Sequence, residues 1–188
     1  MIYIKEYDYS ALSRGEKKKA ESKNARRLLY LAIKAEHSIS SQHLTMSKGE
    51  FGKPFFSQYP DIHFNISHSG DYAAVMVSRF ECGVDIQKIK EVKQSVVRKI
   101  CSYEELRFIE NSADKDRAFI TLWALKESFV KAVGKGLSFD LSKVNFCIVT
   151  HGGEITEIQC NQKGSFFVKN LDEYILAACT LGEVALYE

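Results

Sequence analysis

Three charged side chains interrupt a long apolar segment in the second half of the chain. Residues 119–133 contain good helix formers and no proline, and glycines follow directly, so this segment predicts one helix. In that helix Glu127 and Lys131 lie one turn apart on a narrow stripe, and Lys126 falls inside the apolar arc. Because isolated charges are costly to bury, these groups either form an ordinary surface pair, with Lys126 extended toward water, or line a wet cleft that holds a ligand or metal ion.

A fourth charged group stands in an apolar strand pattern. Alternation over residues 82–87 places Asp85 and Gln87 on one face, with Cys82, Val84 and Ile86 on the other. An aspartate between β-branched residues is unfavourable in a strand. Asp85 therefore begins a turn or faces a cationic group.

The segment Ser67-His68-Ser69-Gly70 lies between two expected strands, residues 62–66 and 71–77. Its hydroxyl, imidazole and backbone N–H donors predict a tight polar turn, which either cradles an anion or is simply hydrogen-bonded to itself. A catalytic Ser–His pair is disfavoured because adjacent residues of an extended chain point to opposite sides.

The other elements must bring these groups together. A strand is expected at residues 2–7 and a helix at about 20–36, after a lysine-rich segment; residues 91–118 predict two helices, the second beginning with a capping box at Ser102 and Glu105. Further strands are expected at 144–149, 154–159, 165–169, 173–179 and 183–187. Both halves run strand, helix, then hairpin. We therefore expect an α+β fold of two similar α/β subdomains, residues 1–82 and 83–188, with the active site in the cleft between them.

Composition limits the possible functions. The net charge of +2 over 188 residues is too small to argue for nucleic-acid binding, and no apolar run is long enough to span a membrane. The first residues lack the pattern of a signal peptide, and the five cysteines are scattered without a C-x-x-C pair. A cytoplasmic protein with free thiols, without a zinc site, is expected.

Four stretches occur in a fixed order: Gly52-Lys53-Pro54, Phe64-Asn65-Ile66-Ser67-His68-Ser69, Gly83-Val84-Asp85-Ile86, and Trp123-Ala124-Leu125-Lys126-Glu127-Ser128-Phe129-Val130-Lys131. In this combination the chain resembles the 4′-phosphopantetheinyl transferases of the surfactin-synthetase-activating type. The resemblance spans roughly residues 20–150. It implies a pseudo-duplicated fold that binds coenzyme A between its halves and transfers the 4′-phosphopantetheine arm to a serine of an apo acyl or peptidyl carrier protein.

The resemblance also implies a Mg²⁺ site. Asp85 and Glu127 would hold the ion against the pyrophosphate, with Gln87 at a position where many relatives of this type have glutamate. Lys131 would neutralise pyrophosphate charge, and Glu127 would take the proton of the serine. Asp85, Glu127 and Lys131 are thus the expected catalytic residues. Two carboxylates plus phosphate oxygens and water suit Mg²⁺.

The residues expected to bind coenzyme A are carried over from the same family, position by position. They are Arg27 at the 3′-phosphate, Lys53 and Pro54 beside the adenine, Ser67 and His68 at the phosphates, and Lys126 and Lys131 on the helix. Which of the three lysines at 17–19 adds a phosphate contact stays open.

The carrier is expected to dock on the helical segment after Asp85, where Val96, Val97 and Ile100 accompany Arg98 and Lys99, although these apolar residues could equally be core. Since the chain contains both halves, it should act as a monomer. The alternatives are a short-type enzyme of primary metabolism, a non-catalytic module that binds coenzyme A or carrier proteins, and a Mg²⁺-dependent phosphohydrolase.

Overall fold

The N-terminal half is a three-stranded antiparallel sheet covered by one long helix. A computed structural model describes residues 1–182. The sheet has the order β1 (Ile2–Glu6), β5 (Tyr72–Ser78), β4 (His63–Ser69), and α1 (Arg14–His37) packs on β5 and β4. A short hairpin of β2 (Met46–Lys48) and β3 (Pro54–Phe56) follows α1, after the 3-10 turn η1 (Ser41–His43).

The C-terminal half repeats this plan with more helices. Its sheet has the order β6 (Cys82–Lys88), β10 (Tyr174–Thr180), β9 (Ser165–Leu171), and α4 (Lys115–Val133) packs on β6 and β10. The remaining elements are α2 (Gln94–Ile100), α3 (Tyr103–Asn111), the 3-10 turns η2 (Gly136–Ser138) and η3 (Leu141–Lys143), and the hairpin β7 (Phe146–His151) and β8 (Glu154–Cys160).

The two sheets have the same topology. In each, the last strand of the half lies at the centre, between the first strand and the next-to-last strand. The central strands begin with Tyr72 and Tyr174, whose ring centroids are 4.8 Å apart. A local duplication expected from the sequence is thus visible in the strand order.

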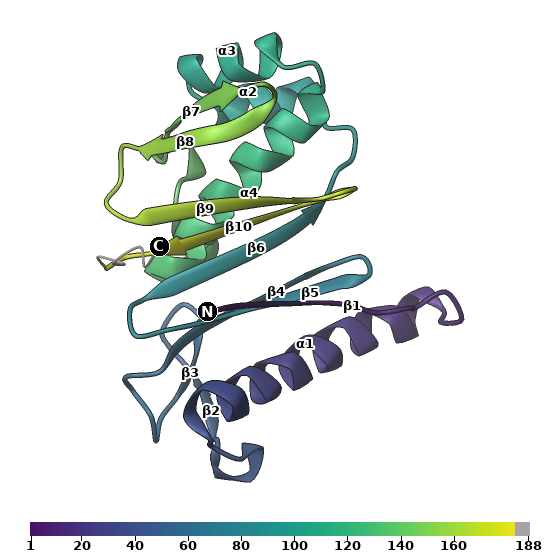
Figure 1. Cartoon of the computed structure of the whole chain (residues 1–188), viewed down its shortest axis with the longest axis vertical. Helices are drawn as coiled ribbons and strands as arrows, with labels where there is room; N and C mark the ends of the chain where they lie inside the picture. Colours follow the sequence, from purple (N-terminus) through teal and green to yellow (C-terminus); the bar gives the residue numbers. More distant parts are fainter. Residues whose placement is uncertain (183–188) are drawn as a thin grey trace.

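Three hydrophobic cores organise the molecule into layers. One lies under α1, one lies under α4, and the third lies between the two sheets, where Ala74 and Met76 meet Val84, Ile86 and Leu176. The halves are stacked one above the other in Figure 1, with β4 and β5 beside β6. The order of layers is therefore α1, first sheet, second sheet, α4.

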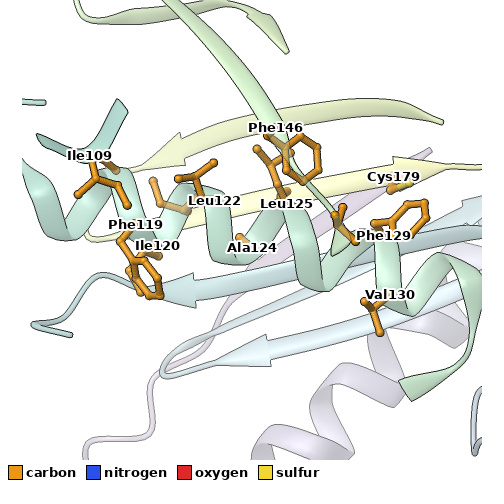
Figure 2. Close-up of a cluster of buried hydrophobic side chains, with 14 of the residues drawn as sticks. Ile109, Phe119, Ile120, Leu122, Ala124, Leu125, Phe129, Val130, Phe146 and Cys179 are labelled. Atoms are coloured by element: carbon orange, nitrogen blue, oxygen red, sulfur yellow. The ribbon is translucent and has the colours of Figure 1, made fainter. Parts of the chain in front are cut away.

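Helix α4 is the central element of the C-terminal half. The side chain of Asp114 accepts a hydrogen bond from the Arg117 N–H at its start, and Gly134 ends it in the left-handed conformation with φ of 77°. Figure 2 shows its apolar side chains gathered with Phe146 and Cys179 from neighbouring strands. The predicted absence of an ordinary solvated face is confirmed, because most of this helix is buried.

Most expected elements occur close to their predicted bounds, with one clear correction. Ser67, His68 and Ser69 do not form a turn; they are the last residues of β4, and only the residues after them turn. The capping box at Ser102 is confirmed. The strand expected at 183–187 lies outside the described residues. Within residues 1–182 no helix is both long and apolar enough to cross a membrane.

Candidate functional site

The candidate site lies where β4, β6 and α4 meet. Strand β6 presents alternate residues to α4, so Asp85 points toward the helix while Val84 and Ile86 enter the core between the sheets. Asp85 is only 2% exposed. A carboxylate so deeply buried requires charge or hydrogen-bond partners.

Asp85 has such partners on both oxygens. The Lys131 Nζ lies 2.6 Å from its Oδ1, and the Ser67 Oγ donates to the same oxygen at 2.9 Å. The Gln87 Nε2 donates to Oδ2 at 2.9 Å. Lys131 also donates to the Ser67 Oγ at 3.0 Å and to the Val84 carbonyl at 3.1 Å. Residues expected at one site from both halves thus form one polar network.

Glu127 adds a second carboxylate on the neighbouring turn of α4. Burial raises the pKa of Glu127, nearby Asp85 raises it further, and Lys131 lowers it. Buried Asp85 and partly buried Glu127 therefore lie near one lysine, which forms its ion pair with Asp85. Such a group has an excess of negative charge that a divalent cation would relieve.

The close approach of β6 to α4 depends on Gly83. A Cβ atom at this position would lie 2.0 Å from the Ser128 carbonyl oxygen and 2.5 Å from the Ala132 nitrogen. Only glycine allows the strand and helix to touch here. Because Asp85 follows two residues later, this contact brings the carboxylate within reach of Lys131.

Gln87 does not present its oxygen to Asp85. A carboxylate only accepts hydrogen bonds, so the Gln87 amide must turn its NH₂ group toward Oδ2, as the 2.9 Å contact shows. Among residues 1–182, no three His, Cys, Asp or Glu side chains gather as a metal cluster. In this arrangement Gln87 orients the Asp85 carboxylate through its NH₂ group.

Lys126 does not reach the site, and the expectation that it binds coenzyme A is wrong. Its side chain is 0% exposed and pairs with the fully buried Glu105, with 2.8 Å between Nζ and Oε2. It also donates to the carbonyls of Ile100, Leu141 and Val144. Its position in the apolar arc serves the core, where it ties α3 and the segment before β7 to α4.

Lys53 joins the two halves. Its Nζ contacts the Glu81 carboxylate and donates to the carbonyls of Cys82, at 3.2 Å, and Ala132, at 2.7 Å. Its stem packs against Gly134, just beyond α4. Pro54 begins β3 next to it. In this conformation the ammonium group is bound to protein oxygens at the C-terminal end of α4.

Arg27 and His68 lie on the N-terminal half, outside the polar network around Asp85. Arg27 is exposed on α1, on a hollowed face whose cationic residues are Lys18, Lys19, Lys23, Arg26 and Arg27. None of these five forms an ion pair with any described residue. His68 is partly exposed near the end of β4, with its Nδ1 3.8 Å from Glu21 of α1. The exposed lysines and arginines of α1 therefore provide positive charge that could attract an anion.

Comparison with known proteins identifies the chain. Residues 81–179 match the model of the 4′-phosphopantetheinyl transferase superfamily, and residues 5–80 match that of the 4′-phosphopantetheinyl transferase N-terminal domain. The chain belongs to the 4′-phosphopantetheinyl transferase superfamily. The resemblance that the four sequence stretches indicate is thereby confirmed.

Several relatives in this superfamily are similar over long segments. A 4′-phosphopantetheinyl transferase of Bacillus subtilis is 31% identical over 81% of this chain and 70% of its own length. The transferase Sfp of Bacillus subtilis strain 168 is 35% identical over 61% of this chain and 52% of its own. The human L-aminoadipate-semialdehyde dehydrogenase-phosphopantetheinyl transferase is 33% identical over 68% of this chain and 47% of its own length.

The chain spans about half the length of most of these relatives; for the gsp transferase of Aneurinibacillus migulanus the share is 42%. The crystal structure of the Thermotoga maritima holo-[acyl-carrier-protein] synthase aligns over 53% of this chain and 61% of its own, at 20% identity and a TM-score of 0.43. That likeness is too low to bear on the site.

Helix α2, on which the carrier is expected to dock, is only partly exposed. Val97 of α2 is 3% exposed and belongs to the core under α4, so its expected role in docking is wrong. Val96 is 36% exposed and Ile100 is half-buried, while Arg98 and Lys99 are exposed. The outward face of α2 is therefore basic with a single exposed apolar residue.

Sequence reasoning missed three residues of this region. Asn65 and Ser69 of β4 accept hydrogen bonds from backbone N–H groups of β6, and Glu105 neutralises Lys126. Alternation in Asn65-Ile66-Ser67-His68-Ser69 places three polar residues on one face, a signal that could have marked the contact. Glu105 was visible only as a capping residue of α3.

Proposed function

We propose that this chain transfers the 4′-phosphopantetheine arm of coenzyme A to a serine of an apo acyl or peptidyl carrier protein, releasing the holo carrier and adenosine 3′,5′-bisphosphate. The observation that carries the proposal is the network of Asp85, Ser67 and Lys131 beside Glu127, built from both halves of a chain of this superfamily. The relatives' names describe the same activity for them.

The residues at the site fit a Mg²⁺ ion. Asp85 and Glu127 would hold it, since Mg²⁺ binds one or two carboxylates and completes its shell with phosphate oxygens and water. When bound, the ion would neutralise the negative charge that develops on the pyrophosphate. Gln87 would keep Asp85 oriented through its 2.9 Å hydrogen bond.

The chain's own groups account for the remaining chemistry. Phosphoryl transfer depends mainly on positioning and on stabilising charge. Lys131 would hold its ammonium group against the leaving phosphate, and Glu127, directly or through water, would accept the proton of the carrier serine.

Coenzyme A would extend from this site across the N-terminal half. Arg27 and His68 offer charge and hydrogen bonds for its phosphates, and Pro54, the first residue of β3, lies in the segment expected beside the adenine. Ser67 would contribute through Asp85 and Lys131, because its hydroxyl is already bonded to both. Lys53 would support the loop from its contacts at α4.

We further propose a monomer of two pseudo-equivalent halves, divided near residues 82 and 83, that acts in the cytoplasm. Both sheets and the complete network come from one chain, which supports the monomer. All five cysteines are free thiols, which suits a reducing compartment. The basic face of α2 would receive an acidic carrier.

The rival function is a non-catalytic module of the same fold, which Gln87 in place of a glutamate would favour. Intact-protein mass spectrometry of an apo peptidyl carrier domain and an apo fatty-acid carrier, each with this protein, coenzyme A and Mg²⁺, separates the two. A gain of one phosphopantetheine that a chelator prevents supports the transferase. Binding of coenzyme A in calorimetry, without mass gain under any divalent metal, supports the module.

A further inference from the structure

Three alternating polar side chains of β4 accept hydrogen bonds from backbone N–H groups on the unpaired edge of β6. The three bonds run from Val84 N to Asn65 Oδ1 at 3.0 Å, from Ile86 N to Ser67 Oγ at 3.1 Å, and from Lys88 N to Ser69 Oγ at 3.1 Å. Each partner pair is nineteen positions apart in the chain. We call these three bonds the β4–β6 clasp.

The clasp takes the place of a backbone ladder between the halves. β4 and β6 are edge strands of two separate sheets, so no main-chain pairing joins them. The N–H groups of β6 on that edge point away from β10 and need acceptors, because a buried backbone donor without a partner is costly. Short polar side chains of β4 supply those acceptors.

The middle bond of the clasp is part of the catalytic network. The Ser67 Oγ that accepts from Ile86 N also donates to Asp85 and accepts from Lys131. Asp85 lies between the first two clasp amides along β6. A slide of β6 by one residue would turn Asp85 to the opposite face, away from α4.

From this arrangement we propose that Asn65 and Ser69 are positioning residues, which hold β6 in register on β4 and so set Asp85 against Ser67 and Lys131. The proposal deepens the proposed function and rests on it. Neither residue contacts Asp85, Glu127 or Lys131 by a hydrogen bond, so any effect on transfer must pass through the strand.

The two outer bonds differ in their surroundings. Asn65 is 5% exposed, so no water can replace its oxygen at the Val84 N–H when the side chain is changed. Ser69 is half-buried at the end of the strand, where water can replace its hydroxyl. Asn65 should therefore contribute more to the register than Ser69.

The test compares four variants. Asn65→Leu removes the acceptor at similar volume, and Asn65→Ser keeps one, since serines at the two other clasp positions make the same bond. Ser69→Ala removes the outer bond. Ile109→Val, on α3, which packs on α4 and β7, is a control for general loss of stability. The readouts are kcat and KM for coenzyme A, and amide exchange of Val84, Ile86 and Lys88.

We expect Asn65→Leu to lower kcat about tenfold or more with little change in KM, since misplacement by about 1 Å costs up to a hundredfold. Asn65→Ser should recover most of this, and Ser69→Ala should lower kcat by less than about threefold. Ile109→Val should leave kcat unchanged. An Asn65→Leu variant that is less stable but as fast as the wild type would overturn the proposal.

Amide exchange keeps the inference separate from the proposed function. In Asn65→Leu, Ile86 and Lys88, whose acceptors remain, should exchange faster together with Val84, because the register of the strand is lost. Faster exchange at Val84 alone would overturn the proposal. A wild-type protein that transfers nothing would instead refute the proposed function, and the exchange of Ile86 and Lys88 would still decide whether Asn65 holds the register.

Discussion

Gly83→Ala is the substitution that most directly tests how the fold builds the site. The added Cβ would lie 2.0 Å from the Ser128 carbonyl oxygen, whereas ordinary contacts begin near 3.4 Å. Both close neighbours are backbone atoms of α4, which no side-chain rotation can move away. The helix and β6 must therefore separate by more than about 1 Å, a strain that typically costs about 1–3 kcal/mol of stability.

The same separation would act on the catalytic groups. The 2.6 Å contact between Lys131 Nζ and Asp85 Oδ1 would stretch beyond hydrogen-bond length, and Glu127 would move with the helix. A displacement of about 1 Å can cost a hundredfold in rate. We expect transfer under single-turnover conditions to fall by at least about tenfold, together with a lower midpoint in urea unfolding.

A matched control is Gly15→Ala in α1, where an added Cβ meets nothing within 4 Å. Because alanine favours a helix over glycine by about 0.5–1 kcal/mol, this variant should be slightly more stable and transfer at the normal rate. If Gly83→Ala kept both wild-type stability and wild-type transfer, the tight contact between β6 and α4 would not be what positions Asp85.

Three further changes have defined outcomes. The pKa of Glu127 is raised by burial, so the stability that its neutral form contributes is present below the ordinary glutamate pKa of about 4.3 and lost as the pH rises through the raised value. Metal-free Glu127→Gln should therefore unfold at higher urea than the wild type at neutral pH, with the gap closing in acid; equal stability at neutral pH would contradict this. Lys126→Met should cost about 3–5 kcal/mol, because it leaves buried Glu105 unpaired, and a loss below about 1 kcal/mol in urea unfolding would refute the buried pair. Lys53→Met should speed the amide exchange of Gly134, whose N–H donates to the Val130 carbonyl at the end of α4, because Lys53 binds the neighbouring Ala132 carbonyl. If the variant instead raised the KM for coenzyme A and left this exchange unchanged, Lys53 would be a direct ligand contact.

Local patterns were sufficient for the helices and most strands, and long-range contacts explain the corrections. Helix α4 follows from its composition and its terminal glycine, although its polar first turn, capped by Asp114, begins before the apolar pattern does. Ser67 and Ser69 indicate a turn when considered alone. They lie in a strand because β4 continues its backbone pairing with β5 as far as Ser69, opposite Tyr72, and their hydroxyls bond amides of β6, nineteen residues away, instead of closing a turn.

The site could be predicted as a set of residues but not as a set of contacts. The family resemblance predicts Asp85, Glu127 and Lys131 at one site; in the structure Lys131 pairs with Asp85, and the charges of both influence the pKa of Glu127. The position of Lys126 inside the apolar arc sets it apart from Glu127 and Lys131, but its buried pairing could not be predicted because its partner Glu105 lies on another helix. Which group of Gln87 faces Asp85 likewise depends on the hydrogen-bond chemistry of the assembled site.

The measurement that tests the proposed activity most directly is the mass of an apo peptidyl carrier domain after incubation with coenzyme A, Mg²⁺ and either wild-type protein or Glu127→Gln. The site described here predicts one added phosphopantetheine with the wild type, and none with a Glu127→Gln variant that is folded and still binds coenzyme A. Equal mass gain with both proteins would contradict the role of Glu127, and no gain with the wild type on any carrier tested would contradict the transferase itself.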